Sequence, residues 1–102
     1  GSILITGTAN AVTCRDVANT TFKSNNAVFV AIQFLEDTVF DNAGLTSEDN
    51  NIYINDTVAS TSIDADGGAV TDGITFPKGL TIYGRWTSIL LDSGKVIAYI
   101  GY

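Results

Sequence analysis

The run from Val28 to Leu35 constrains the fold more strongly than any other segment of the chain. In an extended conformation its alternate side chains point to opposite faces, and both of those faces are mainly apolar. Its density of β-branched and aromatic residues favours a strand over a helix. Because a strand that is apolar on both faces has to be covered on both, we expect this one to lie at the centre of a sheet.

Shorter runs of the same kind recur along the chain, separated by turn residues. Pro77-Lys78-Gly79 and Asp92-Ser93-Gly94-Lys95 each place a glycine where a turn needs a positive φ. The sequence therefore predicts one all-β domain over residues 1–102, a compact antiparallel β-sandwich or jelly-roll-like barrel of about seven to eight strands. Gly1 and Ser2 look like the remnant of a cleaved tag. The expected strands are Ile3–Thr6, Thr20–Lys23, Val28–Leu35, Ile52–Asn55, Ile74–Phe76, Leu80–Leu91 and Val96–Ile100.

The last two of these runs are expected to pair as a hairpin across the Asp92–Lys95 turn. Alternation then places one face of the hairpin in the core, namely Trp86, Leu90, Val96 and Ile100. The opposite face is too apolar for full exposure and too polar for a core. We keep two interpretations of it, a subunit interface and a covered sheet face within the domain. This face consists of Tyr83, Arg85, Ile89, Ile97 and Tyr99, and Gly84 between them predicts a bulge or a close backbone approach.

Composition excludes several classes of function. The chain has no histidine and one cysteine, Cys14, so it has no disulfide framework, no Cys/His zinc site and no histidine general base. A net charge of −6 argues against direct binding to nucleic acid. No apolar run reaches the roughly 18 residues of a membrane-spanning helix. We therefore expect no enzymatic activity, no cofactor and no membrane partner, and for Cys14 a structural or incidental thiol in preference to a nucleophile.

The segment from Asn42 to Asn51 is mainly polar. It is expected to form an exposed loop, or a short helix beginning at Thr46 or Ser47. Exposed polar loops are where a glycan-binding module would hold its ligand. The candidate binding residues are Glu48, Asp49, Asn50 and Asn51, with Asp64–Asp66 from a second loop.

Asp64-Ala65-Asp66-Gly67-Gly68 sets alternate carboxylates before a glycine, as the first part of a calcium loop does. Asp72 could supply a further oxygen, but no glutamate follows Asp66 to complete the ligand set. The match to a calcium site is therefore partial, and a plain acidic turn is the favoured interpretation.

Two C-terminal segments carry a recognisable pattern. Ile74–Ser88 contains an aromatic-Pro-x-Gly turn and the strand Thr-Ile-Tyr-Gly-Arg-Trp, and Leu91–Tyr99 contains the return Ser-Gly-x-Val-Ile-Ala-Tyr. Together with Phe29–Phe40, these segments resemble small structural proteins of tailed phages, especially phages of marine bacteria and cyanobacteria. The intervening loop carries little of this resemblance.

The resemblance implies a component of the virion, such as a capsid decoration protein, a head fibre or knob, or a tail-fibre module. Such proteins are usually β-rich homo-oligomers, often trimers, so the implied partners are further copies of the chain and other capsid or tail proteins. The resemblance brings no catalytic residues. The alternative function is a receptor- or glycan-binding adhesion module that uses the exposed polar loops.

Overall fold

The computed structural model describes residues 1–14, 27–49, 52–55 and 69–102. These residues form an all-β fold of seven strands, and no helix occurs among them. The strand predicted at Thr20–Lys23 lies outside the described residues. The strands are β1 (Ser2–Ile5), β2 (Val12–Thr13), β3 (Val28–Phe34), β4 (Thr38–Ser47), β5 (Thr75–Phe76), β6 (Thr81–Ser93) and β7 (Val96–Gly101).

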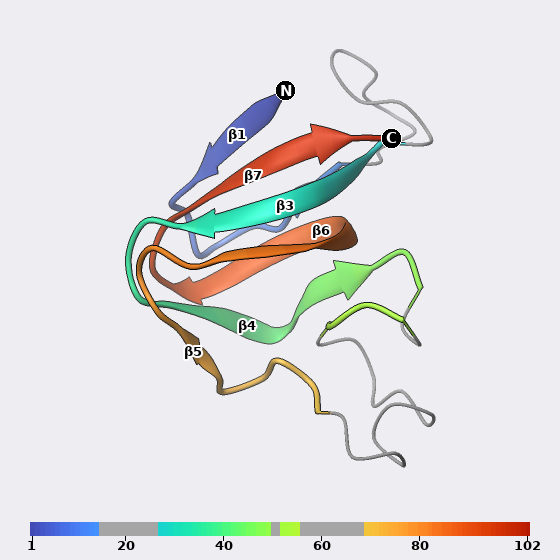
Figure 1. Ribbon diagram of the computed structural model, residues 1–102. Coiled ribbons are helices and arrows are strands. Elements are labelled where there is room, and N and C mark those ends of the chain that lie inside the picture. The colour runs from blue at the N-terminus through green and yellow to red at the C-terminus, as the bar shows by residue number, and fades with distance from the viewer. Residues whose placement is uncertain (15–26, 50–51, 56–68) are drawn as a thin grey trace.

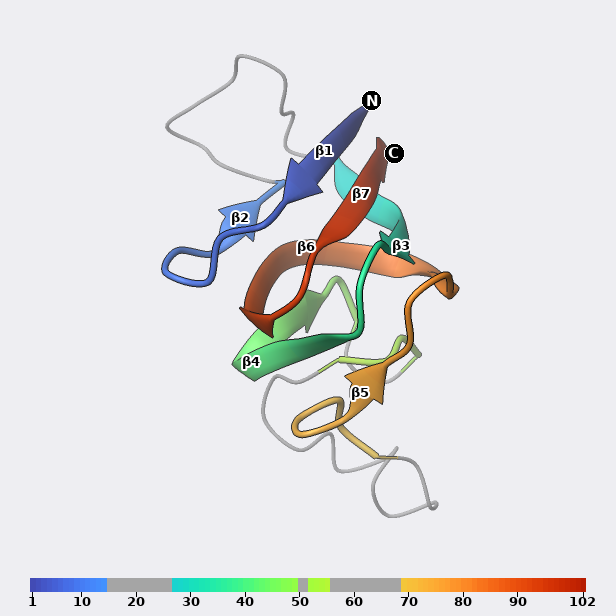
Figure 2. The ribbon, with the colours of Figure 1, turned by 90° about the vertical axis from the view of Figure 1, so that its left-hand side faces the viewer.

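All strand pairs in this sheet are antiparallel, and the strand order is β1-β7-β3-β6-β4-β5, with β2 also paired to β6. The long strand β6 joins two layers because its partners change along its length. Its first half pairs with β3, whereas its second half pairs with β2 and β4. Figures 1 and 2 show β6 bending back on itself between these halves. The single sheet thereby folds over its own core, as in a sandwich or barrel.

The core fills the space between the layers. The β1, β3 and β7 layer contributes apolar side chains such as Phe29, Ile32 and Val96, and the β4 layer contributes Leu45 and Phe40. Trp86 of β6 is fully buried in the same cluster. At one end three phenylalanine rings pack against one another, with ring centroids 5.0 to 5.9 Å apart, and these are Phe34, Phe40 and Phe76.

The prediction that Val28–Leu35 forms a central strand is confirmed. The strand β3 lies between β6 and β7, and five of its seven residues are buried. Strict alternation is broken at one point, because Val30 is an extra residue between the pairs that Phe29 and Ala31 make with β7. This bulge places Phe29 in the same core cluster as Ile32.

The predicted hairpin between β6 and β7 is wrong. Both strands instead pair with β3, which lies between them. The turn prediction itself holds in part, since Gly94 has φ of 102°. The turn carries the chain from one layer to the other, and a buried two-sided strand takes the hydrogen bonds that a local hairpin would have made.

The turn at Pro77–Gly79 also forms without a hairpin. Gly79 has φ of 91°, and the Leu80 amide donates to the Pro77 carbonyl at 3.2 Å. The same turn then contacts the end of β3, where the Gly79 amide donates to the Phe34 carbonyl at 2.8 Å. The strands on the two sides of this turn therefore do not pair with each other. Instead β5 pairs with β4, and the start of β6 pairs with β3.

The exposed loop or short helix expected from Asn42 to Asn51 is corrected by the structure. Residues up to Ser47 belong to β4, and Leu45 is fully buried against β6. The strand bulges outward between Phe40 and Leu45, where its register with β6 shifts and Ala43 has φ of 56°. The polar residues of this segment therefore mark a bulged strand. The expected strand at Ile52–Asn55 is a turn and irregular chain instead.

Candidate interaction surface

The outward face of the β1-β7-β3-β6 layer carries two rows of side chains that cross all four strands. Register fixes the members of each row, because paired residues in a sheet point to the same side. The first row runs Leu4, Ile97, Gln33, Thr81, and the second runs Ser2, Tyr99, Ala31, Tyr83. The neighbouring rows, which include Ile32 and Val96, face the core.

Large side chains are exposed on this face. Tyr83 is 78% exposed, Leu4 is 60% exposed and Tyr99 is 38% exposed. Both tyrosines pair with Ala31, whose small side chain lies between them on the central strand. The Tyr99 hydroxyl donates to Oε1 of Gln33 at 3.1 Å, which links the two rows. The result is a platform of aromatic and aliphatic groups with a polar centre.

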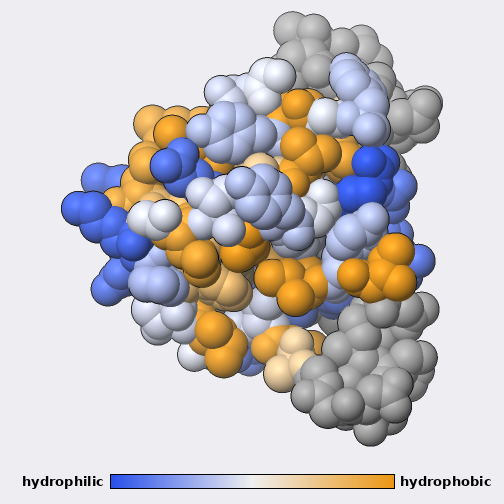
Figure 3. All heavy atoms as spheres, in the orientation of Figure 1, coloured by the Kyte–Doolittle hydropathy of each residue, from blue (hydrophilic) through white to orange (hydrophobic). Residues whose placement is uncertain are grey.

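None of the eight residues in the two rows is charged, although the whole chain has a net charge of −6. Figure 3 shows hydrophobic and weakly polar side chains across these strands, with the strongly hydrophilic ones mainly at the rim. An uncharged region on an acidic molecule is where another acidic molecule meets least repulsion. The region defined by these two rows is called the outer face below.

The predicted interface residues are only partly brought together. Tyr83, Ile97 and Tyr99 all lie on the outer face. Ile89 does not, because it is fully buried in the core cluster, and its assignment to an interface is corrected. The cause is a bulge in β6 at Thr87. The residues on either side of it pair with consecutive residues of β4, Ser88 with Thr46 and Trp86 with Ser47. Thr87 is therefore an extra residue, and the side chains before and after it no longer follow one pattern of alternation between the two faces.

Arg85, the remaining predicted interface residue, is in neither row of the outer face. Its Nε donates to Oε2 of Glu48, and the two form an ion pair with each side chain 31% exposed. The hydrogen bond that Arg85 donates to Glu48 raises the pKa of Arg85 above its ordinary value. The backbone joins the same residues, since the Glu48 amide donates to the Arg85 carbonyl at 2.8 Å. This pair fixes the end of β4 to the bend of β6, so its first role is structural.

The predicted loop candidates lie next to that ion pair. Glu48 is engaged with Arg85, while the Asp49 carbonyl accepts from the amides of Ile52 and Tyr53 at 3.3 Å each. Asn50 and Asn51 lie outside the described residues. The described part of this loop is therefore organised by backbone turns, and its use in binding a glycan stays a prediction.

The partial calcium motif is mostly outside the described residues, since Asp64 and Asp66 are not among them. Asp72 is described and is exposed. The described residues contain no group of three or more acidic or cysteine side chains arranged to hold a metal ion. Calcium binding accordingly has no support from the geometry that is described.

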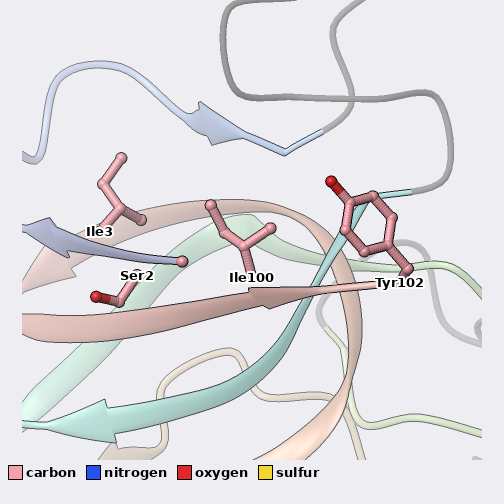
Figure 4. Close-up of a pocket in the computed structure, with 5 residues that line it drawn as sticks. Ser2, Ile3, Ile100 and Tyr102 are labelled. Carbon is pink, nitrogen blue, oxygen red and sulfur yellow. The ribbon is translucent and has the colours of Figure 1, made fainter.

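A pocket of about 300 Å³ lies beside β1, at the edge of the sheet. Figure 4 shows Ile3, Ile100 and Tyr102 projecting to one side of the sheet there, whereas Ser2 points to the other. The pocket lining also includes Gly1. It holds no charged side chain, and its walls are the flank of β1 and the end of β7.

Sequence reasoning missed five of the eight members of the outer face, and these are Ser2, Leu4, Ala31, Gln33 and Thr81. Leu4 could not be predicted as a member, because β1 pairs with β7 at the other end of the chain and no local sequence pattern indicates that pairing. Its place between Ile3 and Ile5 was the one available hint, since alternate residues of an edge strand face opposite sides. Gln33 is the polar residue that interrupts the apolar run, and it marks the outward face of β3.

Comparison with known proteins assigns no family. No family model, no curated protein and no solved structure matches the chain. Among the described residues, no helix is long and apolar enough to cross a membrane. The candidate function accordingly rests on the outer face and on the residues that build it.

Proposed function

We propose that this protein is a self-associating structural module of a phage virion, a capsid decoration protein, head fibre or knob, or tail-fibre module. The observation that carries the proposal is the outer face, an uncharged platform on which Tyr83, Tyr99 and Leu4 are exposed. Tyrosine is a residue type that interfaces favour. The proposed occupant of the outer face is a second copy of the same chain.

Charge supports a copy as the partner. Two molecules of net charge −6 repel each other over most of their surfaces, and the outer face contains no charged residue. A compact β fold suits a repetitive assembly. The C-terminal resemblance to small phage structural proteins points to the same setting.

The test of self-association compares two lysine substitutions in the full chain. Tyr83→Lys places a charge on the outer face, and Ile52→Lys places the same charge on a side chain that is 65% exposed elsewhere. Both changes bring the net charge closer to zero, so general repulsion falls equally in each. Sedimentation velocity over a concentration series should show the same oligomers for the wild type and for Ile52→Lys, and smaller or weaker oligomers for Tyr83→Lys. A monomeric wild type, or equal effects of the two variants, overturns the proposal.

The virion setting has its own test. The gene is expected beside genes for a major capsid protein, a portal or a fibre, and the protein is expected on purified particles. A gene located among host metabolic genes, or particles that lack the protein, would contradict this part of the proposal while leaving self-association intact.

A glycan-binding adhesion module is the second candidate, and one observation favours it. Tyr83 and Tyr99 offer exposed rings beside the Gln33 amide, and carbohydrate rings stack on such aromatic groups while polar side chains hold their hydroxyls. A glycan array run on the wild-type protein, together with its sedimentation velocity, distinguishes the two candidates. Binding that Tyr83→Lys abolishes, in a wild type that stays monomeric, would favour the adhesion module.

A further inference from the structure

The free edge of β1 has a defined set of unpaired backbone groups. In the described part of the chain β1 is the terminal strand of the sheet and pairs with β7 alone. The Ile100 amide donates to the Gly1 carbonyl at 2.6 Å, so Gly1 and Ile100 are a hydrogen-bonded pair. Because hydrogen-bonded pairs alternate in an antiparallel ladder, the backbone of Ile3 also points toward β7. The N–H and C=O groups of Ser2 and Leu4 therefore point away from the sheet.

Among the described residues, this edge lacks the charges, proline and bulges that protect many terminal strands, and its one such feature is its short length of four residues. Natural sheets guard exposed edges with lysine, proline, bulges or inward-pointing charges. The β1 sequence Ser-Ile-Leu-Ile contains no charged residue and no proline, and its register with β7 is uninterrupted. Ser2 and Leu4 are both exposed. The edge is therefore competent to accept another strand.

We propose that the β1 edge pairs with the β1 edge of a second copy, as an antiparallel two-fold contact that continues the sheet from one molecule into the other. The inference deepens the proposed function, on whose self-association it rests, by assigning a second contact distinct from the outer face. A copy is the fitting occupant because the edge is self-complementary, and because β1 and β7 contain no charged side chain in a chain of net charge −6.

The free groups determine the register of this contact. Ser2 of one copy lies opposite Leu4 of the other, and each such pair exchanges both of its N–H···O bonds. Ile3 then lies on the two-fold axis opposite its own copy, on the side of the sheet where the pocket opens. Each Ile3 side chain extends the apolar wall that Ile100 and Tyr102 form in its partner. Leu4 lies on the opposite side, so the outer face also continues across the contact.

A proline substitution isolates the edge from the rest of the fold. Leu4→Pro removes the one backbone donor that points outward at position 4 and leaves the bonds between β1 and β7 in place. Leu4→Ala is the matched control, because it removes the side chain and keeps the donor. Two such donors are lost per two-fold contact, so Leu4→Pro should weaken dimerisation roughly tenfold or more relative to Leu4→Ala.

Cysteine crosslinking tests the register directly. Cβ atoms of a non-hydrogen-bonded pair are about 4.5–5.5 Å apart, close to the reach of a disulfide. Ile3→Cys should therefore form a covalent dimer when a copper(II) oxidant takes up the two electrons of the paired thiols and the buffer takes up their two protons. Thr6→Cys should not, because position 6 is far from its own copy in this register. Cys14 is fully buried and should contribute no background.

The outcomes separate the edge from the outer face. Weaker association for Leu4→Pro than for Leu4→Ala, with a covalent dimer for Ile3→Cys only, supports the edge contact. Equal association of the two Leu4 variants, or no selective crosslinking of Ile3→Cys, overturns it, even if Tyr83→Lys still dissociates the protein. A wild type that is monomeric at every concentration overturns both the edge contact and the proposed function.

Discussion

The ring of Trp86 lies directly over Gly84, so that a Cβ atom at Gly84 would come within 2.7 Å of the ring atom Cζ2. The ring is fully buried, and its Nε1 donates to the Ile54 carbonyl at 2.7 Å. Gly84 also sits where the register between β3 and β6 shifts, since Phe29 pairs with Trp86 and Ala31 with Tyr83. The predicted bulge and close approach at Gly84 are therefore both present, and they make room for Trp86 at the bend of β6.

Gly84→Ala is expected to destabilise the fold by about 1–3 kcal/mol, the usual cost of overfilling a packed core. The ring cannot move away without breaking its hydrogen bond to Ile54. Gly7→Ala is the control, because a Cβ atom there meets nothing within 4 Å. Thermal unfolding should show a lower midpoint for Gly84→Ala alone. An unchanged midpoint would show that the bend accommodates a side chain.

Trp86→Phe should lower the free energy of unfolding by about 2–4 kcal/mol, because it combines a lost hydrogen bond with a smaller ring in the core. The Ile54 carbonyl loses its donor, so hydrogen exchange of the 52–55 segment should accelerate more than exchange in β3. Denaturant unfolding followed by circular dichroism gives the first quantity, and exchange mass spectrometry the second. Uniform acceleration across the chain would contradict the local role of Trp86.

Gly94→Ala should be more damaging than Gly73→Ala. Both glycines have positive φ, 102° and 72°, so both variants have backbone strain. A Cβ atom at Gly94 would also overlap Oγ1 of Thr38, a hydroxyl that donates to the Glu36 carbonyl at 2.9 Å, whereas Gly73 faces open space. The strain alone costs about 1 kcal/mol, so any larger loss for Gly94→Ala measures the contact with Thr38. Equal unfolding midpoints for the two variants would contradict this packing.

The ion pair between Glu48 and Arg85 should contribute little to stability. Each side chain is 31% exposed, and solvent and salt screen ion pairs that are this exposed. A double-mutant cycle of Glu48→Gln and Arg85→Met, measured by urea unfolding, should give a small coupling energy that falls as salt is added. Because the pair lies away from the outer face, neither variant should change the oligomeric state. Dissociation of the oligomer by Arg85→Met would instead show that Arg85 belongs to the interface between copies, as the sequence predicted.

The all-β class and the central strand could be predicted because their signals are local. An apolar run on both faces requires cover on both sides wherever it pairs, so β3 was predictable before its neighbours were known. The glycine turns were predictable for the same reason, since positive φ at Gly79 and Gly94 depends on the residue itself.

The strand order could not be predicted in this way. A good turn at Gly94 says that the chain reverses, but it does not say which strand lies between β6 and β7. The interface prediction failed at Ile89 for a related reason, because an extra residue at Thr87 changes the phase of β6 and no sequence signal marks it. Leu4 joined the outer face only through pairing between distant ends of the chain.

The central claim is that this chain associates with its own copies through uncharged surface, and sedimentation velocity of the wild-type protein tests it most directly. A concentration series at low and high salt should show reversible oligomers that become more stable as salt screens the net charge of −6. A single monomeric species at every concentration and both salt levels would contradict the account.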